Sequence, residues 1–287
     1  MARVNVGHYV LGTQGLALLR SWISGERAAL ERQLEALRHS ADAARPPLTI
    51  ELEVDKLGVL DGYARWSTSY DSAPNPLIRV EQPVVRAWID ATPPGVALDA
   101  ACGTGRHAAY LRERGHRVIG IDATAQMLAR ARPRVPDADL RLGALESLPL
   151  ADASVDLAVC ALALTHATDL MRPIAELARV LRPGGRLIVS DLHPTMVLLG
   201  GTGFFIGADG AAGDVVTYHH PHAAYLAAFR AAGLAVSECA EPGLEETDLQ
   251  ALSGGLIGFA PEAFRAAWVG LPNALIWDLR KAPPAHA

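Results

Sequence analysis

Two acidic residues and two glycines stand at a spacing that suits a nucleotide-like ligand. Asp99 closes a short apolar run that starts at Val96, and Gly103 and Gly105 follow it within a turn of small residues. Glycine lets the backbone approach a ligand, because it has no Cβ. A strand, such a turn and the start of a helix together can bind a ligand of this kind. The Asp99 carboxylate would repel a pyrophosphate, so it favours a ligand that carries an amine or another cationic group.

The second acidic residue, Asp122, ends the next apolar run, Gly115-His-Arg-Val-Ile-Gly-Ile-Asp122. It lies roughly 20 residues beyond the glycine turn, where a carboxylate typically accepts hydrogen bonds from both hydroxyls of a ribose. The two acids therefore predict a ligand with an amine or cationic group at one end and a ribose further along.

Among the ten histidines, two stand where a general base could act. An imidazole suits that role because its unperturbed pKa lies close to 7. His166 ends the stretch Leu162-Ala-Leu-Thr-His166 after a predicted strand, at the edge where open α/β sheets bind ligands. His220 precedes the helix that leads to the C-terminal strands. We take His166 and His220 as candidate catalytic residues; the alternative is that each is a polar loop or capping residue.

No metal site is predicted. His219, His220 and His222 lie close together in the sequence, but no carboxylate or cysteine completes a ligand set at the usual spacing.

Strand-like and helix-like segments alternate through the middle of the chain. Such alternation predicts an α/β fold, with a mostly parallel sheet covered by helices on both faces. Proline and glycine predict a turn at 181–185, and the glycine-rich stretch 200–213 is predicted to be a mobile loop. The predicted strands are 96–99, 118–122, 139–142, 157–161, 186–191, 234–240 and 274–279, and the predicted helices are 80–89, 106–114, 125–131, 170–181 and 221–232.

Four sequence blocks occur in an order and spacing that resemble a known family. They resemble the successive motifs of class I S-adenosylmethionine-dependent methyltransferases, in the methyltransferase type 11 subgroup that acts mostly on small molecules. The resemblance implies a Rossmann-like sheet of seven strands whose last strand is antiparallel. The blocks are Leu98-Asp-Ala-Ala-Cys-Gly-Thr-Gly105, Gly120-Ile-Asp-Ala-Thr124, Leu148-Pro-Leu-Ala-Asp-Ala-Ser-Val-Asp156 and Arg179-Val-Leu-Arg-Pro-Gly-Gly185.

The resemblance also implies S-adenosylmethionine as the cofactor, with Asp99 ordering its amine and Asp122 accepting its ribose hydroxyls. One position departs from the family. Where an acidic residue commonly meets the adenine, this chain has Ala144, so backbone groups there would bind the adenine instead. The expected cofactor-binding residues are Trp66, Tyr70, Asp99, Ala101, Gly103, Gly105, Asp122, Ala123, Met127, Ala144, Leu145 and Ala161.

The expected methyl acceptor is a small aromatic or hydrophobic metabolite. The stretch 161–166 is apolar until His166 and lacks the Asn/Asp-Pro-Pro-Tyr-like motif of DNA amino-methylating enzymes of this fold. The layout of the whole chain is similar to that of bacterial natural-product methyltransferases, some of which methylate carbon 3 of indoles. The alternative is a protein that binds the cofactor without moving a methyl group, such as a cyclase, an isomerase or a binding module. Expected pocket walls are Trp22, Trp66, Phe204, Phe205 and Trp268.

Composition argues against two classes of partner. The net charge of −5 and the lack of a Lys/Arg run argue against a nucleic-acid-binding surface. No apolar run reaches the roughly 18 residues of a membrane helix. Scattered cysteines predict reduced thiols in a cytoplasmic protein. Residues 1–60 are predicted to form a helical extension that acts as a lid or a homodimer contact, or that only packs on its own domain, and residues 61–287 the methyltransferase domain.

Overall fold

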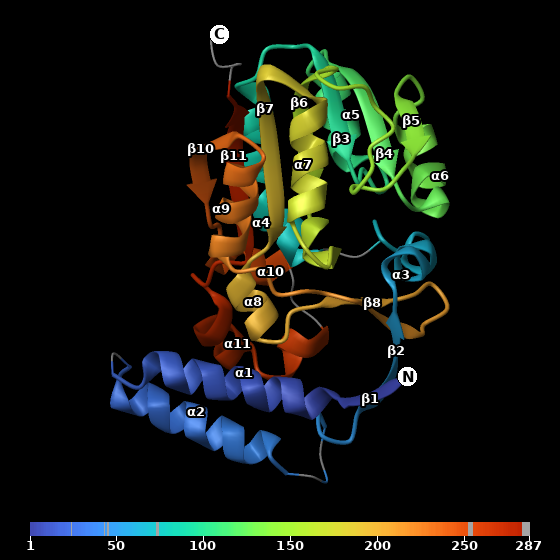
Figure 1. The fold of residues 1–287 in the computed structure, drawn as a ribbon. Coiled ribbons are helices and arrows are strands. Elements are labelled where there is room, and N and C mark those ends of the chain that lie inside the picture. Colours follow the sequence, from blue (N-terminus) through green and yellow to red (C-terminus); the bar gives the residue numbers. More distant parts are fainter. Residues whose placement is uncertain (24, 43, 45, 73–74, 252–254, 283–287) are drawn as a thin grey trace.

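A seven-stranded sheet forms the centre of the molecule (Figure 1). The computed structural model describes residues 1–287 except 24, 43, 45, 73–74, 252–254 and 283–287. The strand order is β10-β11-β7-β6-β3-β4-β5, and only β11 runs antiparallel to its neighbours. The predicted Rossmann-like sheet is therefore confirmed. The strands are β3 (Val96–Ala100), β4 (Arg117–Asp122), β5 (Asp139–Leu142), β6 (Val155–Ala161), β7 (Leu181–Leu192), β10 (Leu234–Ala240) and β11 (Ala274–Lys281).

Helices cover both faces of this sheet, because its strands are apolar on both sides. Successive strand residues point to opposite faces, so Leu98 packs with Ile174 and Phe229, while Ala97 packs with Leu111 on the other face. The covering helices are α4 (Pro76–Asp90), α5 (Arg106–Glu113), α6 (Ala125–Arg134), α7 (Met171–Val180) and α9 (His222–Ala231).

A second, four-stranded sheet lies below the carboxyl ends of the parallel strands (Figure 1). Its strands are β1 (Ala2–Asn5), β2 (Glu51–Leu57), β9 (Ala212–Val215) and β8 (Gly203–Ile206), in that order. The N-terminal region is thus part strand and part helix, and β2 pairs in parallel with β9.

The mobile loop predicted at 200–213 is wrong, because these residues form the β8–β9 hairpin. Glycine in this segment serves close packing. A Cβ on Gly213 would lie 2.5 Å from the Phe205 ring. The turn predicted at Leu181–Gly185 is confirmed in part: α7 ends just before it at Val180, and Gly184 has a φ of 76°, but the segment belongs to a strand. It is the start of β7, where the pairing with β6 shifts register between Val155 and Leu157.

The N-terminal helices α1 (Val6–Ser21) and α2 (Arg27–Ser40) form a hairpin at the bottom of Figure 1. α1 packs on α11 (Pro261–Trp268), with Ala17 against Ala263 and Ala267. Shorter helices, α3 (Val59–Trp66), α8 (Pro194–Leu198) and α10 (Glu246–Ala251), lie between the two sheets and α1. Within the described residues, no helix combines the length and apolar character that crossing a membrane requires.

Candidate active site

Two strand ends of the central sheet carry an unusual backbone conformation. Ala101 follows β3 and Leu162 follows β6, and both have φ of 57°. Residues other than glycine seldom adopt this left-handed region, which costs about 1–2 kcal/mol per residue. Both residues line cavities at the carboxyl edge of the sheet. The chain therefore bends sharply at both strand ends and leaves space beyond the sheet, at the edge where α/β folds bind ligands.

The first space, which we call the Asp122 cavity, has a volume of about 550 Å³. Ala101 lies at one side, and Ala123 and Leu142 give it an apolar wall. Such a mostly apolar cavity with a few polar groups is typical of cofactor sites. Of the expected cofactor-binding residues, it brings together Tyr70, Ala101, Asp122, Ala123, Ala144, Leu145 and Ala161.

Two backbone groups fix the Asp122 carboxylate in this cavity. Gly103 N–H donates to Oδ2 at 2.8 Å, and Thr124 N–H donates to Oδ1 at 2.8 Å. Burial raises the pKa of Asp122, while these two hydrogen bonds oppose the rise. Each carboxylate oxygen can accept a further hydrogen bond. The geometry thus suits a pair of ligand hydroxyls, and it also explains why a glycine turn precedes this strand.

Four other expected cofactor residues lie outside both cavities. Asp99 is buried, and its Oδ2 accepts a hydrogen bond from Ala108 N–H at 2.7 Å in the first turn of α5. Burial raises the pKa of Asp99 to about 6. This contact gives Asp99 a structural role at the start of α5, and its binding of an amine stays a prediction. Met127 is buried in α6. Gly103 and Gly105 shape the turn with positive φ, and their ligand contacts likewise stay predictions.

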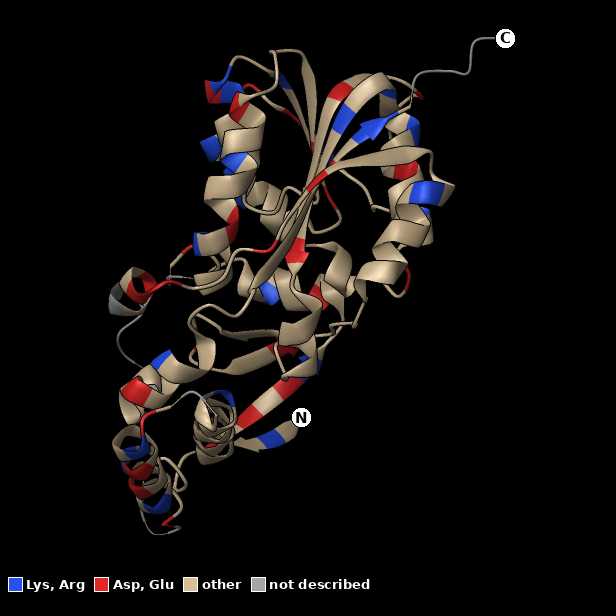
Figure 2. Cartoon of the chain, turned by 90° about the vertical axis from the view of Figure 1, so that its left-hand side faces the viewer, with Lys and Arg blue, Asp and Glu red and all other residues tan. Residues whose placement is uncertain are grey.

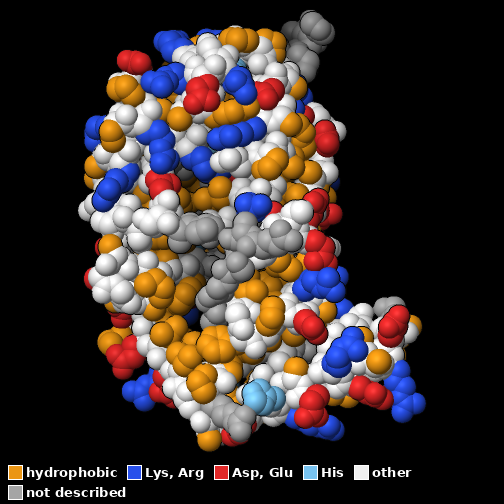
Figure 3. All heavy atoms as spheres, turned by 180° about the vertical axis from the view of Figure 1, so that it is seen from behind, with side chains coloured by type: hydrophobic (Ala, Val, Ile, Leu, Met, Phe, Trp, Pro, Cys, Tyr) orange, Lys and Arg blue, Asp and Glu red, His pale blue; other side chains and the backbone are white. Residues whose placement is uncertain are grey.

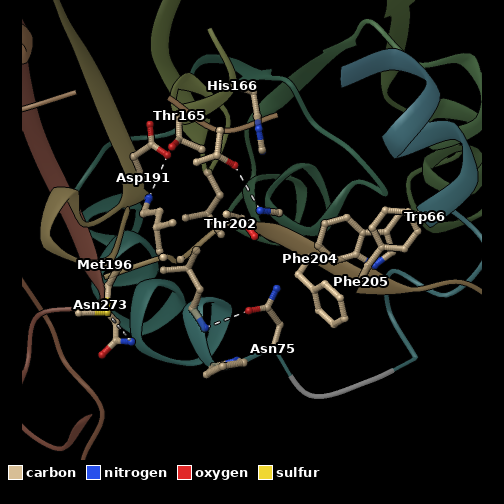
Figure 4. Close-up of a pocket in the computed structure, with 18 of the residues that line it drawn as sticks. Trp66, Asn75, Thr165, His166, Asp191, Met196, Thr202, Phe204, Phe205 and Asn273 are labelled. Carbon is tan, nitrogen blue, oxygen red and sulfur yellow. Dashed lines mark hydrogen bonds between the residues drawn. The ribbon is translucent and has the colours of Figure 1, made fainter. Parts of the chain in front are cut away.

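The second space, the aromatic cavity, has a volume of about 650 Å³ (Figure 4). Trp66 of α3 stacks on Phe205 of β8 at 4.9 Å between ring centroids, with an interplanar angle of 9°. Phe204 and Trp268 also line this cavity, as expected. Trp22 does not: its side chain is 69% exposed near the end of α1, so its expected place in the wall is wrong.

The two cavities meet at four residues. Tyr63, Tyr70, Leu162 and His166 line both of them. Tyr63 and Tyr70 come from the segment that precedes the central sheet in the sequence. Leu162 and His166 come from the segment that follows β6. A group bound in one cavity can therefore face a group bound in the other across these side chains.

A hydrogen-bonded chain runs through this junction. His166 Nδ1 lies 2.6 Å from the Val216 carbonyl oxygen, and His166 Nε2 lies 2.8 Å from the Tyr63 hydroxyl. Because a carbonyl can only accept, Nδ1 carries the proton and Nε2 accepts from Tyr63. Burial lowers the pKa of His166, which favours this neutral tautomer, and raises the pKa of Tyr63. Sequence reasoning missed Tyr63, although it lies close in the sequence to the expected Trp66 and Tyr70.

A buried acid, Asp191, lines the aromatic cavity at the end of β7. The Tyr225 hydroxyl donates to its Oδ2 at 2.8 Å, and Leu192 N–H donates to its Oδ1 at 2.9 Å. Burial raises the pKa of Asp191 to about 7. Sequence reasoning missed this residue. The available signal was its place as the acidic end of a parallel strand, which Asp99 and Asp122 share.

The other expected catalytic residue, His220, lines neither cavity but contacts Ala167, which lines the Asp122 cavity. Its Nε2 lies 2.9 Å from the Ala167 carbonyl oxygen. A catalytic role for His220 stays a prediction.

One cluster with potential metal ligands occurs among the described residues, and it differs from the one weighed in the sequence. It comprises His193, His222 and Glu241. Glu241 Oε1 lies 3.0 Å from His193 Nε2 and 2.7 Å from His222 Nε2. Thr195 N–H donates to His193 Nδ1, so the ring proton lies on Nε2 and points to Glu241. The cluster is thus satisfied by hydrogen bonds as it stands.

Comparison with known proteins agrees with this arrangement. Residues 98–189 match the profile of a methyltransferase domain family. A malonyl-[acyl-carrier protein] O-methyltransferase of Yersinia pestis is 39% identical over 141 residues, which are 49% of this chain and 52% of that protein. A probable S-adenosylmethionine-dependent methyltransferase of Mycolicibacterium smegmatis is 43% identical over 93 residues, 32% of this chain and 36% of that protein. The chain thus spans about half or less of the length of these curated relatives.

Among solved structures, an S-adenosylmethionine-dependent methyltransferase from Mesorhizobium loti is 27% identical, with a TM-score of 0.53. The match covers 70% of this chain and 97% of that one. The [4+2]-cyclase SpnF shares the fold, with a TM-score of 0.55 at 19% identity, over 81% of this chain and 98% of that one.

The fold, the Asp122 cavity and the matched region 98–189 resemble those of class I S-adenosylmethionine-dependent methyltransferases that act on small molecules. S-adenosylmethionine is the cofactor of this class, and the lining fits it: apolar walls for the adenine and the fixed Asp122 carboxylate for the ribose.

Proposed function

We propose that this chain transfers the methyl group of S-adenosylmethionine to a small aromatic or hydrophobic molecule bound in the aromatic cavity. The observation that carries this proposal is the meeting of the two cavities at Tyr63, Tyr70, Leu162 and His166. A cofactor in the Asp122 cavity and an acceptor in the aromatic cavity would face each other there.

The protein's main contribution would be alignment. Bound S-adenosylmethionine supplies an electrophilic methyl group. Asp122 and the apolar wall hold the cofactor, and the stacked rings of Trp66 and Phe205 hold the acceptor. Fixing two reactants in line can contribute about 7–11 kcal/mol to the lowering of a barrier.

His166 and Tyr63 would accept a proton where the acceptor must lose one. The hydrogen bond from Tyr63 to His166 Nε2 lets the hydroxyl oxygen accept a proton from the acceptor while its own proton moves to the imidazole. Oxygen and nitrogen acceptors would need this step. Carbon methylation of an electron-rich ring, such as carbon 3 of an indole, would need it less.

An apolar acceptor fits this site better than the acid that the curated relatives' name suggests. Those proteins are called malonyl-[acyl-carrier protein] O-methyltransferases. A carboxylate acceptor is best bound by Arg or Lys. Neither lines the aromatic cavity within the described part of the chain, and the Asp191 carboxyl lies in its wall. We therefore favour a neutral aromatic acceptor from bacterial secondary metabolism. The free Cys102, Cys160 and Cys239 suit the cytoplasm.

The test is a methyl-transfer screen in which wild-type protein is supplied with S-adenosylmethionine and panels of indoles, phenols and amines. We expect a methylated product and one S-adenosylhomocysteine per methyl group. The fold also occurs in a protein described as a cyclase. Cofactor binding without product from any acceptor would therefore favour the non-transferring alternative.

A further inference from the structure

We propose that the aromatic cavity has a distal subsite, formed by Tyr9, Phe264 and Trp268, that binds a second apolar ring of the acceptor. This proposal rests on the proposed function and deepens it, because it makes the acceptor an elongated molecule with two apolar ends. The three residues line the aromatic cavity together with Trp66 and His166, but none of them lines the Asp122 cavity.

The rings of the distal subsite are arranged as a packed aromatic group. Tyr9 lies parallel to Trp268, with 6.5 Å between ring centroids and an interplanar angle of 9°. Phe264 lies 6.0 Å from Trp268 at 44°. Aromatic rings at such distances attract a further ring in a stacked or tilted arrangement. A similar aromatic group, Trp66 and Phe205, also lines the cavity, and Trp66 stacks on Tyr63 at the junction with the Asp122 cavity.

The N-terminal helix α1 brings Tyr9 to this place, and its packing on α11 is specific. Ala17 is buried against Ala263 and Ala267, which lets the two helices approach closely. The Arg20 guanidinium donates to the carbonyl oxygens of Ala266, Ala267 and Val269 at 3.1, 2.7 and 3.0 Å. A cation at a helix C-terminus satisfies carbonyls that lack partners within the helix. α1 is thus fixed as a wall of the acceptor site.

The chemistry of the subsite selects a neutral group. Within the described residues, the cavity wall contains no Lys or Arg, and its polar members include Asn273 and Thr202. The buried Trp268 Nε1 finds no hydrogen-bond acceptor among the described residues. Unpaired buried donors cost free energy, so a ligand with an ether or carbonyl oxygen near this ring would be favoured. Figure 3 shows a hollow on the back of the molecule, with hydrophobic side chains along its rim.

The test compares two probes, 4-benzylphenol and phenol, which share the reacting ring and differ by a second ring. Their binding to the S-adenosylhomocysteine complex is measured by calorimetry for the wild type, Trp268→Ala and Tyr9→Ala. We expect wild type to bind 4-benzylphenol at least tenfold more tightly than phenol. Both variants should lose most of that advantage, with S-adenosylhomocysteine affinity unchanged. Leu226→Ala is the control, because that side chain is 46% exposed in α9 and lines neither cavity.

Equal affinity of the wild type for the two probes would overturn the subsite, and so would variants that keep the preference. Should Trp268→Ala fail to fold, Trp268→Phe and Phe264→Ala provide the same comparison with smaller volume changes. The readout is binding, so it is independent of turnover. If wild type prefers 4-benzylphenol and the variants lose that preference, but no acceptor is methylated, the proposed function is contradicted and the distal subsite is supported.

Discussion

At the scale of single residues, the junction between the two cavities depends on hydrogen bonds that fix proton positions. The Val216 carbonyl determines the tautomer of His166, and that tautomer determines which atom faces Tyr63. The backbone N–H groups of Gly103 and Thr124 fix Asp122 in the same way. These partners are main-chain groups, so they depend on the fold rather than on further side chains.

Asp122→Ala should weaken S-adenosylhomocysteine binding by at least 30-fold, or about 2 kcal/mol, because two ribose hydroxyls lose a charged acceptor. Calorimetric titration measures it. Asp137→Ala is the control, since Asp137 lies in an exposed loop. Because Asp122 also fixes Gly103, Asp122→Asn should give an intermediate loss. Wild-type affinity in Asp122→Ala would remove this residue from ribose binding.

Tyr63→Phe and His166→Gln should each lower kcat about 10- to 100-fold for a phenol acceptor, since proton transfer typically contributes 100-fold or more. The double variant should be little worse than either single one, because both act in one chain. S-adenosylhomocysteine affinity should stay within threefold of wild type. Losses that multiply in the double variant would show that the two side chains act separately.

The pH dependence follows from the lowered pKa of His166. The base is active when neutral, so activity persists as pH falls past the usual imidazole pKa near 6.5. Activity is then lost as His166 protonates at its own lower pKa. The acid limb of kcat for wild type should therefore lie below pH 6.5 and be absent in His166→Gln. A limb at or above pH 6.5 would contradict the buried, neutral imidazole.

At the scale of elements, α3 and β9 approach each other closely at Gly62. A Cβ there would lie 2.6 Å from Val215 Cγ2. Gly62→Ala should therefore destabilise the fold by about 1–3 kcal/mol and raise the acceptor KM, because Tyr63 and Trp66 move with α3. Gly12→Ala is the control. Gly12 meets nothing within 4 Å in α1, so alanine there should stabilise by about 1 kcal/mol. Thermal unfolding measures both; a Gly62→Ala variant as stable as wild type would refute the contact.

The central sheet could be predicted from the sequence because its strands are short apolar runs with turn signals between them. Val96 and Asp122 mark strand ends that the structure reproduces. The pairing of the second sheet could not be predicted, because β2 pairs with β9 across more than 150 residues. Glycine is also rare in strands, so Gly213 gave no sign of β9. Asp122 and Ala144 were predictable from motif spacing. Tyr63 was not, since its contact with His166 depends on how α3 crosses the strand ends.

At the scale of the whole molecule, charges of both signs are spread over the chain (Figure 2). Several large apolar side chains are exposed, and three of them lie close together in the sequence at the end of α1. Leu19, Trp22 and Ile23 are 67, 69 and 78% exposed at the end of α1. Their spacing places them near one another, and exposed apolar groups of this kind often mark interfaces. We propose that the chain forms a homodimer through its N-terminal helices, with this apolar group in the contact.

Sedimentation of the wild type at micromolar concentration should give about twice the chain mass of 30.4 kDa. Ile23→Glu and Leu19→Glu should shift it to the monomer, because a charge would be buried in the contact. Asp137→Asn, in an exposed loop away from the N-terminal helices, is a charge-altering control expected to leave the dimer intact. A wild type that sediments at the monomer mass would remove the dimer from the account.

The most direct test of methyl transfer uses S-adenosylmethionine with an isotope-labelled methyl group, wild-type protein, Asp122→Ala and the aromatic acceptor panel, with products followed by mass spectrometry. The account predicts a labelled methyl on a neutral aromatic acceptor, one S-adenosylhomocysteine for each, and a large loss of product with Asp122→Ala at limiting cofactor. Cofactor that binds wild type but is recovered intact beside every unmodified acceptor would contradict it.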